Sequence, residues 1–380
     1  MAPRHSLSRR SFLQASTVAS AALALRIVTE PMLARADWPT YPADAVLLNS
    51  NENPLGPCSA ARPAVAAIIP QSGRYHFDLT EQLVKLYARE IGAPEDHVGV
   101  FPGSSPPLYY AVMVFTSPRA SYVTADPGFE GGEHAARNSG ARVVSLPLTK
   151  SYAHDVRAML AAAPDAGLFY ICTPNNPTGT LTSHADIEYL VEHKPSNAIV
   201  LVDEAYIHFS DAPSALDMVQ AGKDVIVLRT FSKIYGMAGL RCGAAIARPD
   251  LLQRLDSYGG FNPMPVTAIV AAMASLKEPD LVAERKRINA DIRAATFAWL
   301  ERNGYSYIPS VSNCFMVDTR RPAKEVIAAM AQQKVIIGRA WPSMPTYTRI
   351  TIGTRDEMER FQAAFHNVMT GKVTARLRPN

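Results

Sequence analysis

One short stretch of the sequence combines a lysine with groups that could hold a phosphate. Lys233 follows Thr230 and Ser232, and Arg241 comes eight residues later. The apolar run 225–228 is typical of a buried strand, so the lysine past its end should be poorly hydrated, with a pKa lowered toward neutrality. A neutral lysine can form a Schiff base with a carbonyl group. The hydroxyls and the guanidinium could hold a phosphate beside it, although the stretch alone fits a surface turn equally well.

A second candidate phosphate site lies in the segment 102–107. Gly103, Ser104 and Ser105 stand just before an expected helix at 108–115. Backbone N–H groups in the first turn of a helix attract anions, and the prolines that follow are tolerated there. An ordinary loop-to-helix junction shows the same pattern, so this interpretation depends on the rest of the chain.

Strands and helices that alternate along the chain predict an α/β fold with a mainly parallel sheet. The expected strands are 121–124, 142–145, 168–172, 199–202, 225–228 and 242–246. Several of them are continuous apolar runs, as expected for strands that are covered on both faces. Ligands of such sheets bind at the carboxyl ends of the strands.

Polar and aromatic residues follow three of these strands at those ends. Phe129 comes after the strand at 121–124, Asn176 after the strand at 168–172, and Asp203 and Tyr206 after the strand at 199–202. Taken singly, such residues are more often turn formers, caps or strand-end charges. Only their common position, at the carboxyl ends of the strands, favours a functional interpretation.

The pattern changes after Pro265 to that of a smaller α+β lobe. Helices are expected at 266–276, 281–303 and 323–333, and strands at 314–318, 335–337 and 348–352. The last helix should begin at a capping box, in which Thr354 and Glu357 satisfy each other's backbone N–H groups.

The excess of basic over acidic residues lies entirely within residues 1–36. Of the 38 Lys and Arg residues and 34 Asp and Glu residues, residues 1–36 hold five arginines and one glutamate. The rest carries 33 residues of each sign, so no nucleic-acid-binding face is indicated. Hydrophobic residues make up 48% and charged residues 19% of the chain, as in a soluble globular protein. The sequence contains no apolar run of about 18 or more residues, so it predicts no membrane span.

Residues 1–36 resemble a twin-arginine export signal. Arg9 and Arg10 stand before Ser11-Phe12-Leu13, an uncharged run extends over 11–25, and Ala34-Arg35-Ala36 provides a small-x-small cleavage pattern. These three signals together predict a cleaved signal peptide and a mature chain that begins at Asp37. Because the twin-arginine route carries folded proteins, a cofactor could be loaded in the cytoplasm before export to the periplasm or beyond. The alternative is a disordered N-terminus.

The four cysteines predict no metal site. Cys58, Cys172, Cys242 and Cys314 are widely separated and form no C-x-x-C pair. They are expected to be small buried apolar residues, although an oxidising compartment would permit a disulfide.

Taken together, the motifs resemble the class I/II aminotransferases, and most closely the histidinol-phosphate aminotransferase branch. The resemblance covers nearly all of the mature chain. It rests on Asn51-Glu52-Asn53-Pro54, Tyr75, Gly103-Ser104-Ser105, Phe129, Asn176-Pro177-Thr178-Gly179, Asp203-Glu204-Ala205-Tyr206, Ser232-Lys233, Ala238-Gly239-Leu240-Arg241 and Arg349-Ile350-Thr351-Ile352-Gly353-Thr354. It implies fold type I of the pyridoxal 5′-phosphate enzymes. The implied parts are the signal peptide 1–36, an N-terminal segment 37–75 that packs with the small domain and a dimer partner, a large cofactor-binding domain 76–262 and a small domain 263–380.

The resemblance also implies a role for each motif residue in a pyridoxal 5′-phosphate site. Lys233 would hold the cofactor covalently and move the proton, and Asp203 would pair with the ring nitrogen. The other implied contacts are Asn176 and Tyr206 on the ring oxygen, Phe129 on the ring face, and Gly103, Ser104, Ser105, Thr230, Ser232 and Arg241 around the phosphate. Tyr75 would reach the phosphate of a neighbouring subunit, which implies a homodimer with shared active sites. Arg349 would bind the substrate carboxylate, with Arg339 and Asn51 also on the substrate side. For Arg339, an ion pair is an equal alternative.

Two features of the sequence depart from that branch. A phenylalanine, Phe129, stands where a tyrosine is usual, which keeps the stacking surface and removes a hydroxyl. The export signal also departs, because histidine synthesis is cytosolic.

The motif residues are compatible with three functions. The first is an aminotransferase that moves an amino group from an amino acid or amino-alcohol phosphate to a 2-oxo acid. The second is a decarboxylase or cyclase of the same fold and cofactor, since the pocket decides which bond at the substrate Cα breaks. The third is a non-catalytic exported binding protein, against which Lys233, Asp203 and Arg349 weigh.

Overall fold

The computed structural model describes residues 40–372. The chain divides into two compact units, Met1–Ala45 and Val46–Asn380. Of the first unit only 40–45 are described, and they contain a turn in which the Ala45 N–H donates to the Pro42 carbonyl. The predicted export signal and its cleavage site lie outside the described residues.

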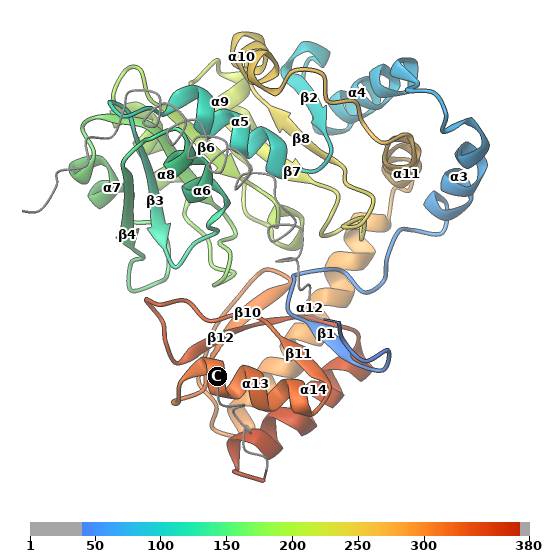
Figure 1. Ribbon diagram of the computed structural model, residues 1–380, viewed down its shortest axis with the longest axis vertical. Helices are drawn as coiled ribbons and strands as arrows, with labels where there is room; N and C mark the ends of the chain where they lie inside the picture. Colours follow the sequence, from blue (N-terminus) through green and yellow to red (C-terminus); the bar gives the residue numbers. More distant parts are fainter. Residues whose placement is uncertain (1–39, 373–380) are drawn as a thin grey trace, which may run out of the picture. The chain divides into compact units, whose positions relative to one another are not determined.

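A seven-stranded mixed sheet organises most of the second unit (Figure 1). Its strands are β2 (Val98–Phe101), β3 (Ser121–Asp126), β4 (Val143–Pro147), β5 (Ala166–Cys172), β6 (Ile199–Asp203), β7 (Val225–Thr230) and β8 (Gly243–Ile246). They lie in the order β2-β8-β7-β6-β5-β3-β4. The five strands from β3 to β7 run parallel, whereas β8 is antiparallel to both β7 and β2. The predicted α/β fold is confirmed.

The central strands are buried on both faces. Every residue of β5, β6 and β7 is buried, which explains why these runs are apolar without alternation. Within residues 40–372, six helices pack against the strands of the sheet: α4 (Phe77–Ile91), α5 (Ser105–Phe115), α6 (Gly131–Asn138), α7 (Val156–Ala162), α8 (His184–His193) and α9 (Leu216–Gln220). Three more pack on other helices: α10 (Pro249–Gly259) on α5, α11 (Val266–Leu276) on α4, and α3 (Ala61–Ile68) on α11. The carboxyl ends of β5, β6 and β7 are therefore rigid positions from which to project side chains.

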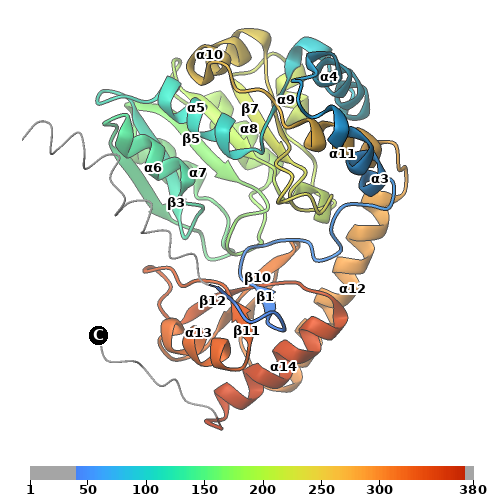
Figure 2. The same cartoon turned by 45° about the vertical axis from the view of Figure 1, so that its right-hand side comes forward.

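A second hydrophobic core holds the elements of the smaller lobe. It comprises α12 (Leu281–Arg302), α13 (Ala323–Gln332), α14 (Arg355–Met369), a sheet of β12 (Tyr347–Thr351), β10 (Cys314–Asp318) and β9 (Tyr307–Ile308), and the pair β1 (Val46–Leu48) and β11 (Val335–Ile337). In Figure 2 these elements lie together, with β1 among them. The parallel pairing of β1 with β11 brings the segment after residue 48 next to this lobe.

Most predicted elements are present, with shifts at their ends. Helix α5 begins at Ser105 instead of 108, because prolines fit into its first turn. The capping box of α14 is formed by Thr354 and Glu357, as predicted.

The predicted domain limits stay predictions. Helix α11, which they assign to the small domain, contributes Ala268, Ile269 and Ala272 to the larger core. Val46 and Leu48 of the predicted N-terminal segment belong to the second core, and Ala61 belongs to the larger one.

Two further properties concern the described chain. None of the helices within residues 40–372 is both long enough and apolar enough to cross a membrane. Cys58, Cys172, Cys242 and Cys314 are buried free thiols.

Candidate active site

A cavity of about 550 Å³ opens at the carboxyl ends of β5, β6 and β7. A volume of this size suits a small ligand. It is lined by residues from both hydrophobic cores: Asn49, Ser50, Ser104, Ser105, Phe129, Cys172, Asn176, Asp203, Ala205, Tyr206, Thr230, Ser232, Lys233, Arg241, Ile327, Ile337, Gly338, Arg339 and Arg349. Most of the predicted site residues therefore meet in one place.

Lys233 lies three residues past the end of β7 and lines the cavity. Its Nζ is 3.3 Å from the carbonyl oxygen of Ser50, to which it donates. Burial is the main cause that lowers the pKa of Lys233 to about 8 from its ordinary 10.5, and the positive charge of the nearby Arg349 lowers it further. The amine therefore loses its proton far more readily than a surface lysine, which is the property that a Schiff-base lysine needs.

Asp203 ends β6 and is buried at the floor of the cavity. The Tyr170 hydroxyl donates to its Oδ2 at 2.8 Å and the Ala205 N–H to its Oδ1 at 3.0 Å. Burial raises the pKa of Asp203 despite these two donors. A cationic partner in the cavity would hold this carboxylate in its ionised form. The contact with Tyr170 was missed at the sequence level, where a tyrosine within the otherwise apolar strand β5 was the only signal.

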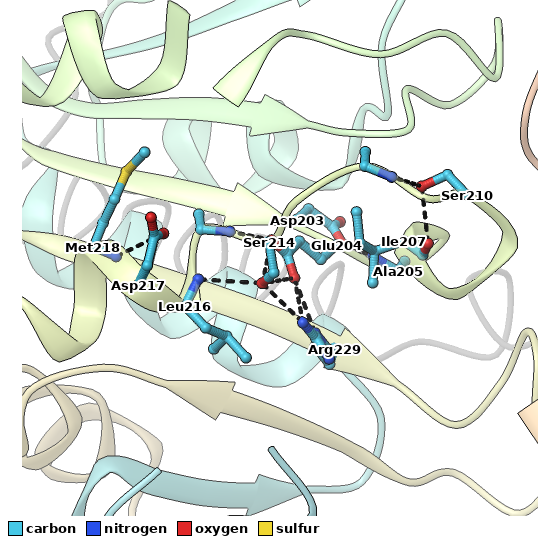
Figure 3. Close-up of polar contacts among 12 residues, drawn as sticks. Asp203, Glu204, Ala205, Ile207, Ser210, Ser214, Leu216, Asp217, Met218 and Arg229 are labelled. Atoms are coloured by element: carbon cyan, nitrogen blue, oxygen red, sulfur yellow. Dashed lines mark hydrogen bonds and ion pairs between the residues drawn. The ribbon is translucent and has the colours of Figure 1, made fainter. Parts of the chain in front are cut away.

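A buried ion pair behind Asp203 was also missed. Figure 3 shows Glu204 facing Arg229 of β7, with Ser214 between them. The Arg229 Nη2 lies 2.8 Å from the Glu204 Oε2, and the Ser214 hydroxyl and the Ala215 N–H also donate to this carboxylate. Both charges are buried and fully paired, so they fix the turn that follows Asp203. The only sequence signal was the acidic residue next to Asp203.

One corner of the cavity is rich in hydroxyl groups and contains a guanidinium. Thr230 donates to the Ser232 hydroxyl at 2.9 Å, and the Arg241 Nη1 donates to the same oxygen at 3.3 Å. Ser104 and Ser105 face this cavity from the start of α5, where the helix dipole favours an anion. The corner can bind a phosphate.

Gly103 shapes this corner without lining the cavity. Its φ of +92° is in the region that favours glycine. A Cβ at this position would collide with the Arg241 guanidinium. Gly103 therefore leaves the space in which Arg241 lies.

Arg349 of β12 faces the sheet from the second core. Its Nη1 donates to the Asn176 Oδ1 at 2.7 Å and its Nη2 to the Asn49 carbonyl at 2.5 Å. The buried Nε has no hydrogen-bond partner among the described residues. Burial also lowers the pKa of Arg349. A buried guanidinium with an unused donor is prepared for an anionic ligand.

Phe129 and Arg339 also line the cavity. The Arg339 Nη2 forms an ion pair with the Glu130 Oε2 at 2.7 Å, and about half of the Arg339 side chain remains exposed. Both predictions for Arg339 thus have support in the geometry, since an ion-paired arginine still borders the cavity.

Tyr75 and Asn51, also predicted at the site, do not line the cavity. Tyr75 is 58% exposed and packs with Phe77 and Phe261 in a surface aromatic cluster. Asn51 is 1% exposed and donates from its Nδ2 to the Tyr206 hydroxyl at 3.0 Å. Its predicted contact with substrate stays a prediction.

The family model for aminotransferase class I and II matches residues 43–365. The chain belongs to this family. Histidinol-phosphate aminotransferase of Moorella thermoacetica is 34% identical over 333 residues, which is 86% of each chain. This assignment confirms the fold, the aminotransferase activity and the cofactor, pyridoxal 5′-phosphate.

Solved structures agree with the family. A protein from Erwinia carotovora atroseptica SCRI1043 is 30% identical with a TM-score of 0.83, covering 88% of this chain and 99% of its own. Histidinol-phosphate aminotransferase from Sinorhizobium meliloti, crystallised in complex with pyridoxal 5′-phosphate, has a TM-score of 0.79 at 24% identity and covers 86% and 91%. The latter likeness concerns the fold.

Proposed function

We propose that this aminotransferase moves an amino group from an amino-alcohol phosphate or an amino acid to a 2-oxo acid, and that the cavity at the ends of β5, β6 and β7 is its active site. One observation carries the proposal: the partly buried amine of Lys233, with its pKa lowered to about 8, shares a single cavity with the carboxylate of Asp203 and the guanidinium of Arg349. The name of the relative from Moorella thermoacetica makes histidinol phosphate the first donor to test.

The residues of the cavity fit pyridoxal 5′-phosphate. The corner with Arg241 and the hydroxyls of Thr230 and Ser232 provides a cation and donors for the phosphate, and Gly103 leaves room for that arginine. The buried Asp203 provides an anion for the ring nitrogen. Asn176 and Tyr206 reach the cavity with amide and hydroxyl groups for the ring oxygen.

When bound, this cofactor supplies an aldehyde that takes up the amine and a ring that withdraws electrons from the substrate carbon. Lys233, once its amine is free, would move a proton from the substrate Cα to the cofactor carbon that carries the transferred nitrogen. Asp203 would hold the ring-nitrogen proton, and Phe129 would lie against the ring. Arg349 would bind the substrate carboxylate with its Nε, which has no hydrogen-bond partner within residues 40–372.

Donors with a phosphate would require a second cation. Arg339 also lines the cavity, and its ion pair with Glu130 leaves about half of its side chain exposed. A negatively charged donor group could exchange with Glu130 at modest cost, because exposed ion pairs contribute little stability.

The same proposal includes a homodimer. Tyr75, Phe77 and Phe261 are each more than half exposed and form one aromatic cluster. Such clusters favour association, and Tyr75 could then reach a partner's cavity. Sedimentation of the wild type and of Phe261→Ser tests this: a wild-type monomer, or an unchanged Phe261→Ser dimer, contradicts the proposed interface.

We further propose export through the twin-arginine route, supported by Arg9 and Arg10 and the cleavage pattern before Asp37. Replacing both arginines with lysine should leave the protein in the cytoplasm with an uncleaved N-terminus, as seen by fractionation and mass spectrometry. Unchanged export of that variant would contradict the route.

The activity is tested by a donor screen on the cofactor-loaded protein. Histidinol phosphate, aromatic amino acids and basic amino acids are mixed singly with the protein, and the visible band of the bound aldehyde form is followed. At least one donor should bleach the band and yield its carbonyl product, which mass spectrometry identifies. Carbon dioxide release would instead favour the decarboxylase, and a band that no donor bleaches would contradict amino transfer.

A further inference from the structure

The segment 49–51, which we call the strap, contacts three different groups of the proposed site. The Asn49 carbonyl accepts from Arg349, the Ser50 carbonyl accepts from Lys233, and the Asn51 amide donates to Tyr206. The first two contacts use backbone oxygens, which residues of any type provide. Only the third depends on a particular side chain, so Asn51 is the position at which the strap is chemically specific.

We propose that Asn51 is a positioning residue that orients the Tyr206 hydroxyl so that its proton points to the ring oxygen of the cofactor. The proposal rests on the proposed function, and it replaces a direct role of Asn51 in binding substrate.

The orientation of the Asn51 amide follows from its other partners. The Thr351 hydroxyl accepts the Asn51 backbone N–H at 2.9 Å, so its own proton is free to go to the Asn51 Oδ1 at 3.2 Å. The Oδ1 therefore faces Thr351, and the Nδ2 faces Tyr206 at 3.0 Å and the Cys314 sulfur at 3.2 Å. In the reverse orientation the Thr351 hydroxyl would have no acceptor for its proton among the described residues, and the Tyr206 hydroxyl would donate to the amide oxygen.

This arrangement determines what the Tyr206 hydroxyl can do. Because the Tyr206 hydroxyl accepts a hydrogen bond from the Asn51 amide, its own proton is left to donate into the cavity that Tyr206 lines. Burial raises the pKa of Tyr206, so the hydroxyl keeps the proton that it must donate. A donated hydrogen bond stabilises the ring oxygen as an anion, and that lowers the pKa of the protonated link between Lys233 and the cofactor.

The backbone at Asn51 is adapted to this task. Its φ is +52°, a region in which asparagine is among the few tolerated side chains. Its carbonyl is held by the Asn313 Nδ2 at 3.1 Å. The Asn51 backbone is thus held through both its N–H and its carbonyl group. Thr351 also links the side-chain amide to the strand β12, which carries Arg349.

The experiment uses the cofactor-loaded protein and measures the pH midpoint of the visible band of the bound cofactor. Asn51→Gly is the main variant, because glycine keeps the positive φ and removes only the amide. The midpoint should rise by about 0.5 to 1 pH unit, the size expected for weakening one hydrogen bond. The charged and titratable groups around Tyr206 are Cys172, Cys314, Lys233 and Arg349, and this variant changes none of them.

A double-mutant comparison separates positioning from a general structural role. Tyr206→Phe should raise the midpoint, and adding Asn51→Gly to it should raise it no further. Asn53→Ala is the control: this neighbour donates to the Ile234 carbonyl instead, and its midpoint should equal that of the wild type. If Asn51→Gly does not load cofactor, Thr351→Val tests the same link and should shift the midpoint in the same direction.

Two outcomes would overturn the inference: a wild-type midpoint in Asn51→Gly, or an equal shift from Asn51→Gly with and without the Tyr206 hydroxyl. Failure of the proposed function has a different signature. In that case the wild type itself would show no amino transfer with any donor, whatever the midpoints of the variants.

Discussion

The two sides of the cavity are built in different ways. On the sheet side, Asp203 ends β6 and Lys233 follows the adjacent strand β7. Asp203 is held by Tyr170 of the neighbouring strand β5 and by the Ala205 N–H of the turn after β6. On the opposite side, Arg349 and the strap lie 300 residues apart in sequence and hold each other. The sheet side is therefore rigid by virtue of its strands, whereas the opposite side exists only when distant segments meet. This difference predicts where a substitution stops the chemistry and where it adjusts binding.

The largest expected effect is on the sheet side. Lys233→Ala should lower kcat by at least about a thousandfold, because the group that binds the cofactor and moves the proton is lost. Steady-state kinetics with the best donor measures this. Lys286→Ala, which removes an ion pair with Asp211 and a hydrogen bond to the Ser210 carbonyl, is the control. Comparable kcat values for the two variants would show that the chemistry is not centred on Lys233.

The next effect concerns the ion pair behind Asp203. Glu204→Gln should lower the free energy of unfolding by about 3–5 kcal/mol, because Arg229 then remains buried without a counter-charge. Urea denaturation measures the change. Glu133→Gln breaks the more exposed pair with Arg137 and should cost less than about 0.5 kcal/mol. Equal losses in the two variants would mean that the sheet side does not depend on its buried pair.

The pH dependence of stability is a third test of the sheet side. In the cofactor-free protein Lys233 has a pKa of about 8 against an ordinary 10.5. Between these values the unfolded chain binds more protons than the folded one, so stability should rise with pH from about 8 to 10.5. Relative to Lys233→Met, the gain should reach at most about 3 kcal/mol. Parallel unfolding curves of the two proteins across this window would contradict a buried, easily deprotonated lysine.

The smallest expected effect is on the opposite side. Arg349→Lys should lower kcat/KM for 2-oxo acids by about 10- to 100-fold, mostly through KM, because a single ammonium cannot replace the planar guanidinium. Competition between 2-oxo acids of different length measures it. Arg339→Lys, at the half-exposed arginine of the cavity, should change this value less. If the order of the two is reversed, the carboxylate binds at Arg339.

The same difference explains what the sequence could predict. The site residues of the sheet side were found because each follows an apolar run, so that local pattern and strand order are enough to bring them together. The contacts of Asp203 with Tyr170 and of Glu204 with Arg229 could not be predicted, because they depend on the register between neighbouring strands. Asn51 was placed among the motifs but given a contact with substrate. Its contact with Tyr206 depends on the pairing of β1 with β11 and on Thr351, and no local pattern encodes that meeting.

The four cysteines have a practical consequence. Each thiol is less than a tenth exposed, and burial raises the pKa of those at Cys172, Cys242 and Cys314. Protonated, enclosed thiols react slowly with oxidants and alkylating reagents. The folded enzyme should therefore tolerate storage in air without a reducing agent, and a cysteine introduced on its surface would be a selective attachment point for a label.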